Sequence, residues 1–378
     1  MKFAVIGAGL IGSAAARHLA TQGAEVTLIG PDEPADKTTH TGPFASHYDE
    51  GRITRGLDPS PFWSRVSRAS IARYAQIEAA SGIRFYSPVG CMMAGTSDSR
   101  QAADMEQIAA RDGIPCTRLD RAQLAHRFSF FDFPDDTIGL LETKDAGHIS
   151  PRRLVSAQIK LAKANGAQHI AEAVMDYNDT DQGVSVRTAT QTLKFDRILL
   201  ATGGFSNPFL GDQLSLTIYG RTVVLFEVSE AEAKRLSTMP SLIYLEPPEN
   251  HPYLLPPIRY PDGRYYLKMG GPTEDPVLST KAELTEWFQS PGDTKAGTEI
   301  EAMLRARMPD LQIDAVSTMS CVTSYTPNEL PYLRSLSPRV FTATGGCGRA
   351  AKNSDELGRL GAGLLTDTPL PVWAKDAG

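Results

Sequence analysis

The feature that most constrains this chain is the glycine pattern near its start, which stands between two short apolar runs. Residues 3–6 are apolar and predict a buried strand, residues 11–21 fit a helix, and residues 25–29 fit a second strand. The pattern is G-x-G-x-x-G, formed by Gly7, Gly9 and Gly12. Such glycines allow a tight turn and a close approach of phosphate to the backbone, and the helix N-terminus supplies free N–H groups. The stretch therefore predicts a β–α–β unit that holds a dinucleotide.

One part of the usual dinucleotide pattern is missing at the end of the second strand. An acidic residue normally stands there to bind the ribose hydroxyls, but this chain has Gly30. Asp32 and Glu33 follow two and three residues later. Either carboxylate could reach the ribose, or both could be solvated loop charges.

Composition limits the class of protein. The chain has 378 residues, enough for a large core and two domains. Its net charge of −6 gives no sign of a nucleic-acid surface. The four cysteines lack disulfide or metal-ligand spacing, and no apolar run reaches the roughly 20 residues of a membrane span. We expect a cytoplasmic, monomeric protein without a metal, nucleic-acid or membrane partner.

A charged segment follows the nucleotide unit at residues 46–55. It contains two arginines, Arg52 and Arg55, three residues apart, together with further ionisable side chains and a tyrosine. The segment could be a solvated loop. The functional interpretation is that the arginines turn inward to a bound anion, since guanidinium matches carboxylate or phosphate geometry.

Periodicity along the rest of the chain predicts alternating helices and strands. Helices are expected at 61–81, 100–112, 120–128, 151–165, 298–307 and 352–365. Strands are expected at 85–94, 168–174, 183–189 and 198–201, and the stretches 214–228 and 242–269 are strand-rich. Two glycine turns stand next to these elements. Thr202 and Gly203 end the strand at 198–201, and they form either a nucleotide contact or an ordinary tight turn.

The second glycine turn, residues 345–348, precedes the last helix and predicts another helix N-terminus facing a ligand. Dinucleotide signals thus lie at both ends and in the middle of the chain. We predict an α/β (α+β overall) fold with a discontinuous Rossmann-like domain and a second strand-rich substrate domain. The nucleotide domain comprises residues 1–80, 146–213 and 320–378. The substrate domain comprises residues 81–145 and 214–319.

Several of these pieces, in this order, resemble the flavin amine-oxidising family that includes D-amino acid oxidase, and within it the sarcosine oxidase branch. They are the GAGLIG unit, the Ser-His segment 46–55, and YLKMG at 266–270. CVTSYTPNE at 321–329 and GGCGRAAK at 345–352 complete the likeness. The resemblance implies FAD as cofactor. It implies an amino acid substrate and molecular oxygen as partners.

The resemblance also implies roles for individual residues. Arg55 and Lys352 would grip the substrate carboxylate, and Tyr48 and Thr323 would lie beside the substrate. Arg52 would lie against the flavin ring, near His47, and Lys268 would activate oxygen; these three are the predicted catalytic residues. The positions that would hold FAD are Gly7, Gly9, Leu10, Ile11, Gly12, Asp32, Glu33, Ser46, Val174, Thr202, Gly203, Cys321, Gly345, Gly346, Gly348 and Lys352.

Cys321 would carry the flavin as a thioether, although a small buried hydrophobe is the alternative. Three positions depart from sarcosine oxidase: Pro272 and Tyr48 replace histidines, and Thr323 replaces a tyrosine. These changes affect the substrate site and leave the cofactor positions intact. The sequence therefore predicts FAD-dependent oxidation of the C–N bond of a secondary or cyclic amino acid, with oxygen reduced to hydrogen peroxide. The alternatives are a flavin dehydrogenase that passes electrons to a quinone or carrier protein, and a non-catalytic flavin-binding subunit.

Overall fold

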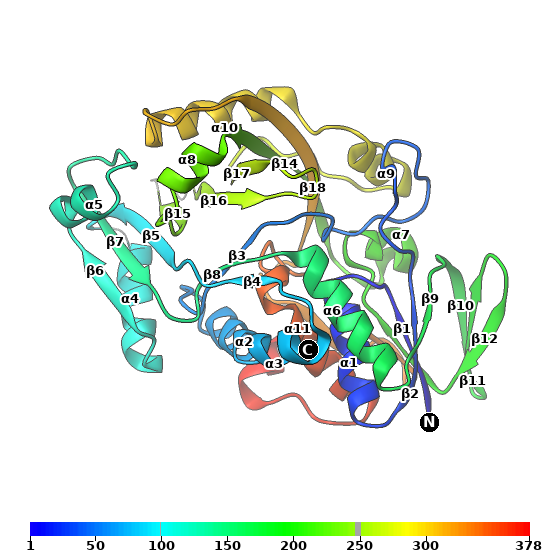
Figure 1. Cartoon of the computed structure of the whole chain (residues 1–378). Coiled ribbons are helices and arrows are strands. Elements are labelled where there is room, and N and C mark those ends of the chain that lie inside the picture. The colour runs from blue at the N-terminus through cyan, green and yellow to red at the C-terminus, as the bar shows by residue number, and fades with distance from the viewer. Residues whose placement is uncertain (99, 246–250) are drawn as a thin grey trace.

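The computed structural model describes residues 1–98, 100–245 and 251–378 and is built around two large sheets (Figure 1). The first sheet consists, in spatial order, of β19 (Tyr332–Ser335), β20 (Val340–Thr344), β13 (Arg197–Leu200), β1 (Lys2–Ile6), β2 (Glu25–Ile29) and β9 (Gln168–Ile170). Its strands are parallel except for β19 at one edge. This arrangement confirms the predicted α/β, Rossmann-like fold class.

Three helices pack together against this sheet: α1 (Leu10–Thr21), α6 (Pro151–Ala164) and α11 (Ala350–Leu365). The small residues 13–16 of α1 are fully buried. Leu19 of α1 and Leu357 of α11 lie in the same apolar cluster, and each is completely buried. Burial of one such side chain contributes about 1.5–3 kcal/mol, so the contact between α1 and α11 stabilises the helix layer.

The second sheet has eight strands and carries the strand-rich stretches. In spatial order they are β18 (Ala315–Tyr325), β14 (Thr217–Val228), β17 (Tyr265–Gly270), β16 (Tyr253–Arg259), β15 (Ser241–Leu245), β5 (Cys91–Thr96), β7 (Thr137–Glu142) and β6 (Cys116–Leu119). β14 and β18 pair antiparallel over almost their whole length. Because β18 belongs to this sheet, the predicted domain boundary at residues 319/320 falls inside a strand, and the domain boundaries stay a prediction.

Two small sheets and the remaining helices complete the fold. The sheets are β10 (Val174–Thr180), β11 (Gly183–Thr188) and β12 (Thr192–Phe195), and β3 (Arg52–Thr54), β8 (Gly147–Ile149) and β4 (Tyr86–Ser87). The helices are α2 (Pro61–Ile71), α3 (Tyr74–Ser81), α4 (Arg100–Asp112), α5 (Arg121–Arg127), α7 (Ser206–Leu210), α8 (Glu230–Arg235), α9 (Lys281–Gln289) and α10 (Thr294–Arg307). Short 3-10 turns occupy Gly203–Phe205, Gly211–Gln213 and Val372–Ala377.

Three predicted elements are wrong in their continuity, and one of them, the strand expected at 168–174, is divided between β9 and β10 of different sheets. The helix expected at 61–81 is broken between α2 and α3, where Arg73 turns to contact Asp355 and Glu356 of α11. The strand expected at 85–94 is two strands, β4 and β5, separated by Gly90 with a positive φ of 82°. These last two breaks are set by contacts or turns that local periodicity does not report.

Other boundaries differ by a few residues. α10 begins at Thr294 because the Asp293 side chain accepts hydrogen bonds from two backbone N–H groups of the first turn. α11 begins at Ala350, two residues before the predicted start. Residues 246–250, inside the stretch predicted to be strand-rich, lie outside the described residues.

Candidate active site

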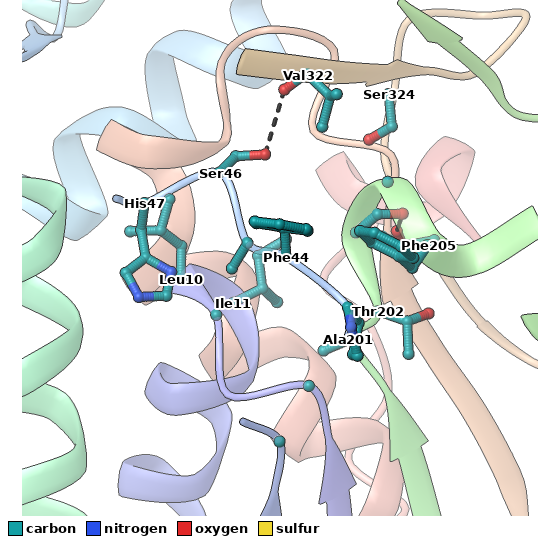
Figure 2. Close-up of a pocket in the computed structure, with 18 of the residues that line it drawn as sticks. Leu10, Ile11, Phe44, Ser46, His47, Ala201, Thr202, Phe205, Val322 and Ser324 are labelled. Atoms are coloured by element: carbon teal, nitrogen blue, oxygen red, sulfur yellow. Dashed lines mark hydrogen bonds between the residues drawn. The ribbon is translucent and has the colours of Figure 1, made fainter. Parts of the chain in front are cut away.

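One large cavity of about 350 Å³ lies where the first sheet meets β18, at the N-termini of α1 and α11. Figure 2 shows Leu10 and Ile11 at the start of α1, with Ser46 opposite them donating a hydrogen bond of 3.2 Å to the Val322 carbonyl. The predicted site residues that line this cavity are Gly7, Gly9, Leu10, Ile11, Ser46, His47, Tyr48, Arg52, Val174, Thr202, Gly203, Cys321, Thr323, Gly345, Gly346 and Gly348. The remaining predicted residues are not among its described lining residues: Gly12, Asp32, Glu33, Arg55, Lys268 and Lys352.

The glycine turn at residues 7–12 has the geometry that phosphate binding requires. Gly7 has a positive φ of 109°, and a Cβ there would lie 2.4 Å from the Ala201 carbonyl oxygen. Gly9 is the N-cap of α1 and makes no side-chain cap. The first N–H groups of α1 therefore remain available at the cavity for an anion.

The structure explains why β2 does not end on an acidic residue. A Cβ at Gly30 would lie 2.4 Å from the Ala8 backbone nitrogen, so no side chain fits on this backbone. The Glu33 carboxylate forms two hydrogen bonds with Arg152, of 2.6 and 2.8 Å. The contact that Asp32 or Glu33 would make with ribose stays a prediction.

The second helix N-terminus comes from the glycine turn at 345–348. Gly345 and Gly348 both have positive φ, and Arg349 is the N-cap of α11 without a side-chain cap. This turn lines the cavity beside Ala350 and Ala351. Two helix N-termini therefore face one cavity from opposite ends of the chain.

His47 is buried at the cavity and is held neutral by its surroundings. Burial, together with the nearby charges of Arg152, Arg52 and Lys37, lowers the pKa of His47 to about 3. Its Nδ1 atom has no hydrogen-bond partner among the described residues. The ring lies 4.7 Å from the Tyr48 ring, edge to face. An unpartnered polar atom at a cavity wall fits a bound group that supplies the missing hydrogen bond.

Arg52 connects the cavity to the cysteine predicted to hold flavin. Its Nη2 lies 3.4 Å from Cys321 Sγ and donates to the Ser46 carbonyl at 3.2 Å. Its Nη1 contacts the Asp49 carboxylate. Lys268 lies behind Arg52, with Nζ 2.5 Å from the same carboxylate. Asp49 stands inside the charged segment that the sequence singles out, but its role as a shared partner depends on the fold.

Arg55 and Lys352 lie beside a common neighbour that sequence reasoning missed, the Asp58 carboxylate. The buried Asp58 Oδ2 lies 3.0 Å from Arg55 Nη1, 3.6 Å from Lys352 Nζ and 4.0 Å from Arg349 Nε. Burial, together with the charges of Arg55 and Arg349, lowers the pKa of Lys352 to about 7, and Asp58 opposes this shift. The spacing of Asp58 three residues after Arg55 is the only local signal for it.

Thr323 also has partners that the sequence does not predict. Its hydroxyl accepts a hydrogen bond of 3.2 Å from Arg221 Nε, and Arg221 forms an ion pair with Asp275. The antiparallel register of β14 and β18 places Arg221 opposite Cys321. No local pattern marks this arginine, because the pairing of two distant strands brings it to the site.

Comparison with known proteins decides between the cofactors that such a cavity could take. Residues 2–364 match the model of the family described as FAD dependent oxidoreductase. The chain belongs to this family. FAD is therefore its cofactor, as predicted, and it is an oxidoreductase. The glycine turns, the two helix N-termini and the unpartnered His47 atom all fit this group.

Individual relatives are more distant. The chain is 27% identical to monomeric sarcosine oxidase of Streptomyces avermitilis over 337 residues, covering 86% of this chain and 82% of that protein. It is 23% identical to N-methyl-L-tryptophan oxidase of Yersinia pestis, covering 97% and 95%. Among solved structures, NikD, an unusual amino acid oxidase essential for nikkomycin biosynthesis, matches with a TM-score of 0.79 at 20% identity, covering 100% and 96%. The last likeness shows the fold alone. Within the part of the chain that the structure describes, no helix is both long and apolar enough to cross a membrane.

Proposed function

We propose that this protein oxidises the C–N bond of a secondary or cyclic amino acid, giving an imine that hydrolyses, with oxygen reduced to hydrogen peroxide. The observation that carries the proposal is the set of cations around Asp58. Arg55 and Lys352 are both buried, and they share a single carboxylate oxygen with Arg349. A surplus of buried positive charge is costly unless an anion neutralises it, and a substrate carboxylate supplies that anion.

The relatives support an amine as the other half of the substrate. Monomeric sarcosine oxidase and N-methyl-L-tryptophan oxidase are each named as oxidases of an N-methyl amino acid. When bound, FAD supplies the acceptor for the hydride or its electron equivalent. Arg55 and Lys352 would bind the carboxylate and orient the substrate carbon toward the cavity. His47 would stay neutral, given its pKa of about 3, so we propose that the amine enters already deprotonated.

An anaerobic experiment tests this function. Mixing the purified yellow protein with N-methyl and cyclic amino acids in the absence of oxygen should bleach the flavin absorbance within a turnover. Admitting air should restore the colour and release one peroxide per substrate oxidised. A flavin that no amine bleaches would contradict the proposal and favour a non-catalytic flavin-binding subunit.

One observation favours the dehydrogenase alternative. Lys268 is not among the described cavity-lining residues, and its Nζ is turned to Asp49 and to the Gly51 carbonyl. If substrate bleaches the flavin but oxygen restores its colour far more slowly than an artificial quinone does, the dehydrogenase assignment replaces the oxidase.

Covalent attachment of the flavin is a separate part of the proposal. Cys321 lines the cavity, and its Sγ lies 3.4 Å from Arg52 Nη2. Acid-precipitated protein should stay yellow, and Cys321→Ala should release the colour into the supernatant. Cys347→Ala is the matched control, because Cys347 is buried next to the same cavity and should keep the colour. Colour that washes out of the unmodified protein would exclude attachment.

A further inference from the structure

Asp49 is a buried carboxylate whose two oxygens are both engaged. The residue is only 2% exposed. Its Oδ2 accepts from Lys268 Nζ at 2.5 Å and contacts the Arg52 guanidinium. Its Oδ1 accepts from the Tyr260 hydroxyl at 2.9 Å and from the Glu50 backbone N–H at 2.7 Å. The orientation of this carboxylate is therefore fixed from four sides.

Lys268 depends on the Asp49 carboxylate more than on any other group. Its side chain is completely buried on β17, and its second hydrogen bond, of 2.9 Å, goes to the neutral Gly51 carbonyl. A buried ammonium is stable only when it is paired and hydrogen-bonded. Among the described residues, Asp49 is the carboxylate within ion-pair distance of Lys268.

Other groups facing Lys268 do not replace that partner. Arg52 carries the same sign of charge and disfavours the ammonium, whereas Cys321 favours it weakly. The Tyr253 ring on β16 lies 5.8 Å from Nζ, and burial raises the pKa of Tyr253 to about 12, so its hydroxyl stays neutral. Tyr260 reaches the lysine only through Asp49. The charge of Lys268 is therefore controlled chiefly by one residue.

The same carboxylate reaches the cavity through Arg52. Arg52 lines the cavity and extends its other guanidinium nitrogen toward Cys321 Sγ. The Asp49 contact therefore fixes the position of the Arg52 guanidinium, and with it the positive charge at the cavity wall. Asp49 thereby connects a lysine with no exposed surface to a guanidinium on the cavity wall.

We propose that Asp49 is a positioning residue that keeps Lys268 positively charged and holds Arg52 in place at the cavity. The inference rests on the proposed function, in which that charge assists the reaction of reduced enzyme with oxygen. A cation stabilises a developing superoxide anion most strongly where water is excluded. Burial and Arg52 lower the pKa of Lys268, whereas a carboxylate held 2.5 Å from Nζ favours the charged form. Without Asp49, the lysine should lose its proton at a lower pH.

The test is the pH dependence of reoxidation in Asp49→Asn. Reduced protein is mixed with oxygen by stopped flow between pH 5.5 and 9.5. The wild type should show a nearly constant rate. The variant should react more slowly as the pH rises, by up to tenfold for each pH unit above the lowered pKa of Lys268. A flat profile for Asp49→Asn, at any rate, would overturn the proposal.

Matched variants separate charge from shape. Lys268→Met should be slow at every pH, because it has no charge to lose. The double variant Asp49→Asn/Lys268→Arg should restore a flat profile, because guanidinium stays protonated throughout this range. A pH-dependent double variant would show that a group other than Lys268 titrates, which would contradict the assignment.

A second readout does not depend on turnover. Thermal melting of the full chain should show that Asp49→Asn and Lys268→Met each lower Tm, and that the Asp49→Asn/Lys268→Met double variant loses less than the sum. Additive losses would overturn the pairing. If the losses are non-additive but Lys268→Met reoxidises as fast as wild type, the pairing stands and the proposed oxygen reaction fails.

Discussion

Lys352 and Asp355 lie on successive turns of α11, and each belongs to a buried cluster of carboxylate and cation side chains. The two clusters differ in how closely their members are bound. In the first turn of α11, Lys352 lies 3.6 Å from Asp58, and Arg349 just before it lies 4.0 Å away. One turn later, Asp355 is hydrogen-bonded to Arg17 at 2.7 Å and to Gln158 at 2.8 Å, and it also contacts Arg73 and His18.

The difference in geometry separates a binding site from a structural joint. All three cations of the first cluster share one oxygen of Asp58, and only Arg55 is at hydrogen-bond distance. The oxygens of Asp355 are fully occupied by groups from α1, α6 and the α2–α3 break. A saturated network stabilises the packing of helices, whereas cations held loosely around a single oxygen leave donors for a ligand.

The largest expected effect is the loss of stability on removing Asp355, the carboxylate of the second cluster. Burial alone would raise the pKa of Asp355, but His18, Arg17 and Arg73 lower it well below its usual value, so the group is charged. Asp355→Asn should reduce the free energy of unfolding by about 3–5 kcal/mol, measured by urea denaturation. Asp58→Asn is the matched change at an equally buried carboxylate and should cost clearly less. Equal losses would remove the distinction between the clusters.

The next effect is on substrate binding at the first cluster. Arg55→Ala should lower kcat/KM for carboxylate-bearing substrates, mainly through a higher KM, because a buried charged hydrogen bond is lost. The corresponding loss of transition-state stabilisation is about 2–5 kcal/mol. Amines without a carboxylate should lose much less. Arg73→Ala in the second cluster is the control: it should lower stability while leaving KM near the wild-type value. Similar losses for both kinds of amine would show that Arg55 does not bind the carboxylate.

The smallest effect is a pH dependence confined to Lys352. Its pKa is about 7 in the folded protein, against a usual 10.5, so between these values the unfolded chain binds a proton that the folded protein does not. Stability from this group therefore rises with pH across that window, by at most about 1.4 kcal/mol per pH unit. Carboxylate affinity should fall over the same range as Lys352 loses its charge.

Lys352→Met should abolish both trends, and urea denaturation at pH 6, 7, 8 and 9 measures the first. Asp355 responds with the same sign in a different pH window: its lowered pKa means that its contribution is lost only as the pH falls into the acid range. A wild-type protein whose stability relative to Lys352→Met stays constant from pH 6 to 9 would contradict a lysine that titrates near neutrality.

The sequence predicts the parts of the site that are local. The glycine turns, the segment 46–55 and the turn before α11 each contain their own pattern, and the structure brings them to one cavity. Patterns that depend on distant contacts are missed. Arg221 reaches the site only through the β14–β18 register, and the break before Arg73 exists because that side chain turns to α11. Neither leaves a trace in local periodicity.

The position of β13 between β1 and β20 has a consequence for how the protein is made. β1 and β20 do not pair directly, so they join one sheet only when β13 lies between them. During synthesis the N-terminal glycine turn leaves the ribosome early, but the opposite wall of the cavity follows more than 300 residues later. The nascent chain therefore cannot enclose FAD until residues 345–348 have been synthesised, and such non-local pairing favours slow folding and a late dependence on flavin supply.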